Sequence, residues 1–228
     1  MIFLRCFLHD ISYFCAMNSL MGLIFLVIPL LGCSFVEWHV WMILPFGNVC
    51  KAVILGLMIL AFLCIFFNFF IGLDGLPTIV ARIFYEIGYS SLFILLYLFM
   101  LFLLADVARW IGILPREYLH ASGVGSLVVL LLIVGIFTYG NLHYYNKVKV
   151  PIALKSSKRL KQPVKMVMVS DIHLGYHNTR TDLAKWVDMI NAEKPDYVLI
   201  AGDIVDFSVV PLLRADMAKE FRRLQAPV

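Results

Sequence analysis

The feature that most constrains this chain is a set of four long stretches that contain no charged side chain. They cover residues 17–36, 52–73, 87–105 and 121–142. As a helix rising about 1.5 Å per residue, each can cross a hydrocarbon core about 30 Å thick. Hiding four such stretches in water would require a very large soluble core. We therefore predict four transmembrane helices, flanked by Trp38, Trp41 and Trp110 as interfacial anchors.

The first stretch is interpreted as a retained span rather than a cleaved signal peptide. It is too long for the apolar core of a signal peptide, and Val36-Glu37-Trp38 is not a small-residue cleavage site. A large domain outside the membrane can then lie only after the fourth span, because the loops that link the spans are short.

Charge is distributed unevenly along the chain. Residues 1–140 hold 5 of the 19 Lys and Arg and 6 of the 15 Asp and Glu, and the rest lie in 141–228. Hydrophobic residues make up 62% of the whole, which excludes an ordinary soluble globule, and no nucleic-acid binding is indicated. We predict a transmembrane domain over 1–146, a basic junction over 147–165 and an α/β segment over 166–228.

The basic junction holds seven Lys and Arg and no acidic residue. Basic residues next to a span stay in the cytoplasm, so an even number of spans predicts both chain ends there. Alternating residues Val148, Val150, Ile152 and Leu154 are typical of an edge strand. The alternative is a linker attracted to anionic lipid headgroups.

The last segment has the pattern of a strand, a helix and a second strand. Apolar runs over 166–169 and 197–201 predict strands, the first of them buried on both faces. Between them Thr179 and Asp182 have capping-box spacing. A helical stripe follows, made of Leu183, Trp186, Val187 and Ile190. A strand–helix–strand unit of this kind predicts two parallel strands.

Polar side chains follow each predicted strand at its C-terminal end. Asp171 and His173 follow the first strand, and Asp203 follows the second. Carboxylate and imidazole ligands without thiolate favour a Mn, Fe or Zn ion. Gly202 leaves space beside Asp203 for an ion to approach the backbone. The five cysteines all lie in the membrane half and support no zinc site.

These residues resemble those of a known family. Ser170-Asp171-Ile172-His173-Leu174-Gly175 and Gly202-Asp203-Ile204-Val205-Asp206 are similar to the D-x-H and G-D-x-x-D blocks of the calcineurin-like metallophosphoesterases, in particular their membrane-anchored bacterial branch. The resemblance implies the first part of a β-sandwich flanked by helices. The apolar stretches and the basic junction place this domain, as an expectation, on the cytoplasmic side of the inner cell membrane. It also implies two divalent ions, with Asp171 and His173 on one ion and Asp203 bridging both, and hydrolysis by a metal-bound hydroxide.

Members of the family continue with a G-N-H-[DE] block, whose His protonates the leaving group, and a G-H-x-H block. Neither is present, so we expect the general-acid His beyond Val228 and no activity from this fragment. Asp206 either supports the metal ligands or caps the next turn. His177 is interpreted as a loop residue, with contact to a substrate phosphate as the alternative.

The leading functional hypothesis is a membrane-anchored phosphoesterase acting on a phosphate ester or pyrophosphate. The anchor and the basic junction favour a lipid-linked substrate, and the alternative is a soluble phosphodiester or phosphoprotein. A transporter is disfavoured because the spans contain no Asp, Glu, Lys or Arg. A non-catalytic anchor or scaffold is the other alternative.

Overall fold

The computed structural model describes residues 27–155, 157–158 and 161–228. Its N-terminal part consists of apolar helices: Val27–Ile43, α2 (Asn48–Phe70), α3 (Thr78–Trp110) and α4 (Gly123–Tyr145). Among the described residues, α2, α3 and α4 are long and apolar enough to cross a membrane. The first predicted span, 17–36, lies only partly within the described residues.

Most apolar side chains on these helices are exposed, which suits helices surrounded by lipid. The helix α4 begins at a polar cap, where the Ser122 hydroxyl accepts a hydrogen bond from the backbone N–H of Gly125 at 3.0 Å. The helix α3 has 33 residues, equivalent to about 50 Å, so it is longer than the hydrocarbon core. It begins at Thr78, well before the charge-free stretch at Ile87.

The chain forms two compact units. One contains the helical residues up to Ala61 together with Ser90–Lys147, and the other contains Phe62–Tyr89 together with Val148–Val228. In the first unit, the His39 imidazole lies 3.0 Å from the Asp106 carboxylate, which also pairs with Arg109. In the second unit, the end of α2, its turn and the start of α3 pack with the polar segment. We call this part, Phe62–Tyr89, the hairpin.

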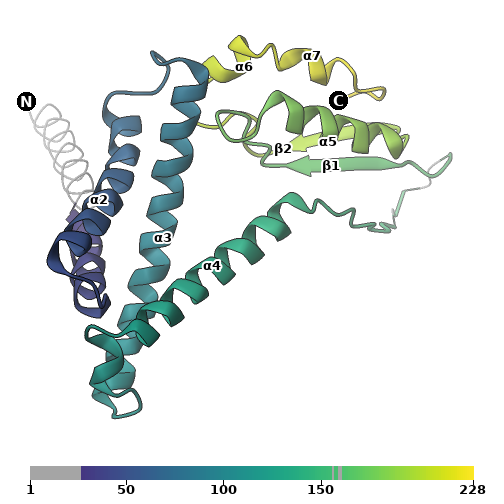
Figure 1. The fold of residues 1–228 in the computed structure, drawn as a ribbon. Helices are drawn as coiled ribbons and strands as arrows, with labels where there is room; N and C mark the ends of the chain where they lie inside the picture. Colours follow the sequence, from purple (N-terminus) through teal and green to yellow (C-terminus); the bar gives the residue numbers. More distant parts are fainter. Residues whose placement is uncertain (1–26, 156, 159–160) are drawn as a thin grey trace, which may run out of the picture. The chain divides into compact units, whose positions relative to one another are not determined.

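The polar segment of the second unit is a small α/β fold, as predicted (Figure 1). The strands β1 (Met166–Ser170) and β2 (Tyr197–Ala201) pair in parallel, with Met166 opposite Tyr197 and Ser170 opposite Ala201. The helix α5 (Arg180–Ala192) connects them, and α6 (Val210–Arg214) and α7 (Ala218–Phe221) follow β2.

The predicted capping box and helical stripe are confirmed. The Asp182 carboxylate accepts hydrogen bonds from the Thr179 backbone N–H at 3.1 Å and from its hydroxyl at 2.8 Å. A hydrophobic core forms between α5, the loop after β1 and the segment after β2. Its buried members are Ile172, Leu174, Leu183, Val187 and Met217.

The prediction that β1 is buried on both faces is wrong for the residues described. Val169 of β1 and Ile200 of β2 pack against the core. On the opposite face, Met168 is 68% exposed and Leu199 is 46% exposed. The apolar run did predict a strand, but it could not show whether a second layer covers the outer face.

The edge strand over the basic junction is not formed. Residues 147–155 have no regular secondary structure, and the four alternating apolar side chains are 70% to 83% exposed. Lys149 and Lys165 instead both pair with Glu193 at the end of α5. Without a neighbouring strand to accept its backbone hydrogen bonds, the alternating pattern alone does not make a strand.

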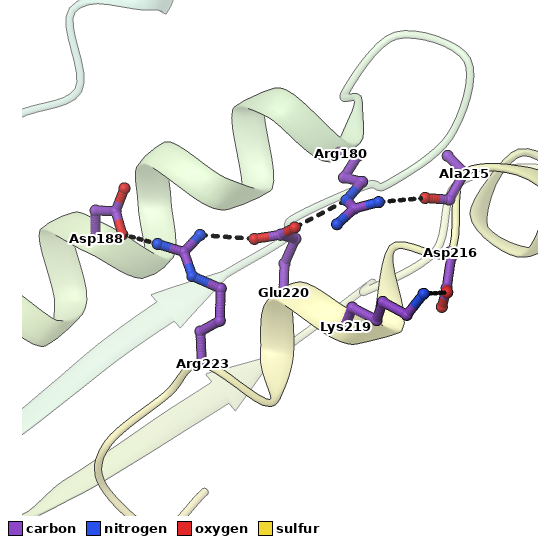
Figure 2. Close-up of polar contacts among 7 residues, drawn as sticks. All are labelled: Arg180, Asp188, Ala215, Asp216, Lys219, Glu220 and Arg223. Carbon is purple, nitrogen blue, oxygen red and sulfur yellow. Dashed lines mark hydrogen bonds and ion pairs between the residues drawn. The ribbon is translucent and has the colours of Figure 1, made fainter.

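An ion network joins α7 to α5 (Figure 2). The Glu220 side chain is buried and accepts hydrogen bonds from Arg180 Nε at 2.8 Å and from an Arg223 guanidinium nitrogen at 2.6 Å. Arg223 also pairs with Asp188 on α5. These hydrogen bonds, first from Arg223 and then from Arg180, lower the pKa of Glu220.

Candidate metal centre at the strand ends

The loops that follow β1 and β2 run side by side. The Asp171 N–H donates to the Ala201 carbonyl at 3.0 Å, and the His173 N–H donates to the Asp203 carbonyl at 3.0 Å. One residue further, the Leu174 N–H donates to the Ile204 carbonyl at 2.9 Å. The parallel pairing therefore extends beyond the strands and brings the backbones of the D-x-H and G-D-x-x-D motifs together.

The backbone at the D-x-H motif is strained. Asp171 has φ of 50° and His173 has φ of 45°, in the left-handed region that L-residues other than Gly seldom adopt. Such conformations cost about 1–3 kcal/mol each and cluster at functional sites. Both predicted ligands, Asp171 and His173, therefore have backbone conformations that are uncommon for residues other than Gly.

Gly202 forms a cradle for the Asp171 carboxylate. Its φ is 73°, and a Cβ atom at this position would lie 2.1 Å from Asp171 Oδ1. The same oxygen lies 3.4 Å from the backbone nitrogen of Asp203. The absent side chain at residue 202 is therefore what lets the Asp171 carboxylate reach the second loop.

The donors fit a divalent cation in chemical type. Asp171, His173 and Asp203 are exposed at one end of the sheet, and their oxygen and imidazole ligands suit Mn, Fe or Zn. Within the described ranges, no three His, Cys, Asp or Glu side chains gather closely enough to enclose an ion. The ligand roles of these three residues therefore stay predictions.

Asp206 lies between His173 and the hairpin. Its Oδ1 is 3.8 Å from His173 Nδ1, and its Oδ2 accepts a 2.5 Å hydrogen bond from the Tyr85 hydroxyl of the hairpin. A Cβ atom at Gly175 would lie only 3.1 Å from the Asp206 Cβ. The role of Asp206, as a support for the ligands or as a cap of the next turn, stays a prediction.

His177 is held by the hairpin. Its Nδ1 lies 2.8 Å from Glu86 Oε1, and this hydrogen bond outweighs burial and raises the pKa of His177. The neighbouring Tyr176 hydroxyl donates to Asp74 Oδ1 at 2.9 Å. Burial, followed by this hydrogen bond, raises the pKa of Tyr176 to about 12.

None of the hairpin residues that contact these loops was predicted from the sequence. Tyr85 and Asp206 are separated by 121 positions, which no local spacing pattern can bridge. The sequence feature that could have indicated these contacts is the presence of three polar side chains, Arg82, Tyr85 and Glu86, directly before an apolar stretch.

Comparison with known proteins agrees with the motifs. Residues 164–228 match the family described as Calcineurin-like phosphoesterase. A protein from Caenorhabditis elegans, named as a metallophosphoesterase, is 28% identical over 178 residues, covering 71% of this chain and 35% of the relative. A protein from Danio rerio, named as a transmembrane protein with a metallophosphoesterase domain, is 33% identical and covers 52% of this chain and 29% of the relative.

A further relative, from Campylobacter jejuni and named as a metallophosphoesterase, is 43% identical over 47 residues, covering 21% of this chain and 13% of the relative. The chain thus spans about a third or less of the length of these relatives. They come from two animals and a bacterium, so the bacterial branch stays a prediction. No solved structure matches the chain at a significant level.

The worm protein is similar over more than the polar segment alone, since the aligned length exceeds the family match. The fish protein is itself named as a transmembrane protein. Residues 164–228 therefore match the calcineurin-like phosphoesterase family, and in this chain they follow a set of apolar helices of membrane-spanning type.

Proposed function

We propose that the protein is a membrane-anchored, metal-dependent phosphoesterase that hydrolyses a phosphate ester or pyrophosphate. One observation supports the proposal: backbone hydrogen bonds pair the two loops at the C-terminal ends of the parallel strands, and these loops carry Asp171, His173 and Asp203. Open α/β sheets bind their ligands at this edge.

Each residue has a defined role in this proposal. Asp171 and His173 would hold one divalent ion, and Asp203 would bridge it to a second. When bound, the ions would supply Lewis-acid stabilisation of charge on the phosphate and a lower pKa for water. Gly202 makes room for the Asp171 carboxylate, and Asp206, whose Oδ1 is 3.8 Å from His173 Nδ1, would orient that imidazole.

The proposed substrate presents its phosphate at the bilayer surface, as a lipid-linked phosphate does. The apolar helices and the basic junction support this choice, because cationic segments next to a span are attracted to anionic headgroups. In this proposal the domain lies on the cytoplasmic side of the inner membrane. A soluble phosphodiester or phosphoprotein is the alternative substrate, and a non-catalytic scaffold the alternative function.

Metal binding tests the proposal most directly. We expect the purified protein to bind Mn²⁺, with Asp171→Asn and Asp203→Asn each reducing the bound metal by more than half. Asp216→Asn is the matched control, because Asp216 is also an exposed Asp with positive φ (49°) but precedes α7. Equal Mn²⁺ content in all four proteins would favour the scaffold.

Hydrolysis tests the substrate class. The longest protein that carries this chain is assayed on a soluble phosphodiester and on a lipid-linked phosphate in vesicles. We expect removal of the apolar helices to reduce turnover of the lipid selectively. Equal loss or retention on both substrates would contradict the lipid-linked substrate.

A further inference from the structure

We propose that the hairpin is a built-in part of the phosphoesterase site, and that Tyr85 is the positioning residue that holds Asp206 behind His173. This inference rests on the proposed function. All residues involved belong to one compact unit, in which Phe62–Tyr89 and Val148–Val228 pack together.

The central contact is the 2.5 Å hydrogen bond from the Tyr85 hydroxyl to Asp206 Oδ2. It leaves Oδ1, the oxygen 3.8 Å from His173 Nδ1, directed at the candidate ligand. The Tyr85 ring is itself restrained, since its centroid lies 4.3 Å from that of Tyr89 and 6.1 Å from that of Tyr176. Tyr85 is thus placed to fix the carboxylate that orients the imidazole.

The next residue of α3 holds the other loop. Glu86 Oε1 lies 2.8 Å from His177 Nδ1, and His177 belongs to the loop after β1. Consecutive residues, Tyr85 and Glu86, therefore contact the loops after β2 and β1 respectively. Both of these loops carry candidate metal ligands.

The turn of the hairpin adds a second group of contacts. The Asp74 carboxylate accepts hydrogen bonds from the Tyr176 hydroxyl at 2.9 Å and from the Ser208 hydroxyl at 2.8 Å. The Arg214 guanidinium of α6 donates to the backbone carbonyls of Asp74 at 2.5 Å and Leu76 at 2.8 Å. Hydrogen bonds thus join both loops and α6 to the turn.

Apolar packing accompanies these hydrogen bonds. Tyr176, which follows β1, is buried in one cluster with Leu73 and Ala81 of the hairpin. Phe207, next to Asp206, makes an edge contact with Phe69 at a centroid distance of 5.6 Å. Because the polar and apolar contacts flank the Tyr85–Asp206 bond, that bond can act as a fixed support.

Groups that orient a metal ligand affect metal binding without touching the metal. Losing such a partner typically weakens metal affinity about 10–100-fold. The Tyr85 hydroxyl contacts Asp206, which in turn lies near the candidate ligand His173. We therefore expect Tyr85→Phe to weaken Mn²⁺ affinity by about tenfold, the lower end of this range.

The experiment measures Mn²⁺ affinity of the whole chain in lipid nanodiscs, from the electron paramagnetic resonance signal of free Mn²⁺. Tyr85→Phe is compared with Tyr89→Phe, which removes a hydroxyl one turn later that accepts from Asn68 instead. We expect weaker binding for Tyr85→Phe and unchanged binding for Tyr89→Phe. Because Tyr85 acts through Asp206, Tyr85→Phe combined with Asp206→Asn should bind no more weakly than Asp206→Asn alone.

A second measurement does not depend on metal. Amide hydrogen exchange of residues 203–208 in the metal-free chain should be faster in Tyr85→Phe than in Tyr89→Phe or the wild type. Wild-type exchange in Tyr85→Phe would overturn the hairpin contact itself.

The two proposals fail differently. If the wild type binds no more Mn²⁺ than Asp203→Asn, the proposed function fails, and hydrogen exchange alone decides the hairpin contact. If the wild type binds Mn²⁺ but Tyr85→Phe binds it equally well, the positioning role fails while the proposed function stands. The same holds if the effects of Tyr85→Phe and Asp206→Asn on Mn²⁺ affinity add in the double variant.

Discussion

At the residue scale, one carboxylate oxygen explains why residue 202 is a glycine. Asp171 Oδ1 occupies the space that a Cβ atom at residue 202 would need, and the backbone there has a positive φ. Asp171 and His173 adopt the same left-handed region without being glycines. Both residues that the D-x-H motif names are therefore among the positive-φ residues, and a glycine opposite accommodates the carboxylate of one of them.

Gly202→Ala should disturb the site more than the fold. The new methyl group must displace the Asp171 carboxylate. The positive φ of residue 202 also adds backbone strain of about 1–3 kcal/mol once the residue is Ala. We expect weaker Mn²⁺ binding and faster hydrogen exchange in residues 171–175. Gly75→Ala is the control, because nothing lies within 4 Å of a Cβ there; similar behaviour of both variants would contradict the cradle.

At the scale of single elements, the start of α5 depends on an ionised carboxylate. Burial alone would raise the pKa of Asp182, but hydrogen bonds from Thr179 and the charge of Lys185 outweigh it and lower that pKa. The capping contribution is therefore present above the unfolded pKa, near 3.8, and is lost as the pH falls through the lower, folded pKa.

We expect acidification below about pH 4 to destabilise α5 in the wild type but not further in Asp182→Asn. Thr179→Ala should cost about 1 kcal/mol at neutral pH. Urea unfolding, followed by Trp186 fluorescence with the other three tryptophans changed to Phe, measures both effects. A parallel acid response in wild type and Asp182→Asn would exclude the cap as its origin.

The short helix α7 depends on the Glu220 network. Glu220→Gln removes the charge that Arg180 and Arg223 share, which leaves Arg180 without its carboxylate partner and Arg223 with Asp188 alone. We expect faster hydrogen exchange of α7 amides and a lower unfolding midpoint. Lys219→Gln, which breaks only the exposed pair with Asp216, should have little effect. Equal effects would show that the network does not hold α7.

At the scale of the whole molecule, the polar segment would expose apolar side chains in two places when it is isolated. Among its described residues the sheet has two strands with an exposed apolar outer face, and Tyr176 is buried by hairpin residues. We expect residues 147–228 expressed alone to be partly folded and prone to aggregate. A sharp, reversible two-state melt of this segment would contradict us; addition of Phe62–Tyr89 in a fusion should improve its solubility.

The sequence predicted those parts of the molecule that depend on local pattern. The parallel strands, the capping box and the stripe of α5 follow from spacing within a few turns, and the apolar helices follow from length and composition. The edge strand at Val148–Leu154 was predicted wrongly because alternation does not reveal whether a partner strand exists. The hairpin contacts of Tyr85 and Asp74 could not be predicted, because they join residues more than a hundred positions apart.

The length of α3 has a mechanical consequence. A helix longer than the surrounding hydrocarbon adapts to a thinner bilayer by tilting, and a continuous helix of 33 residues cannot tilt without moving its ends. Tyr85 lies in this helix, and its hydrogen bond to Asp206 tolerates only tenths of an ångström of displacement. A change in the tilt of α3 would therefore move Tyr85 and disturb its hydrogen bond to Asp206.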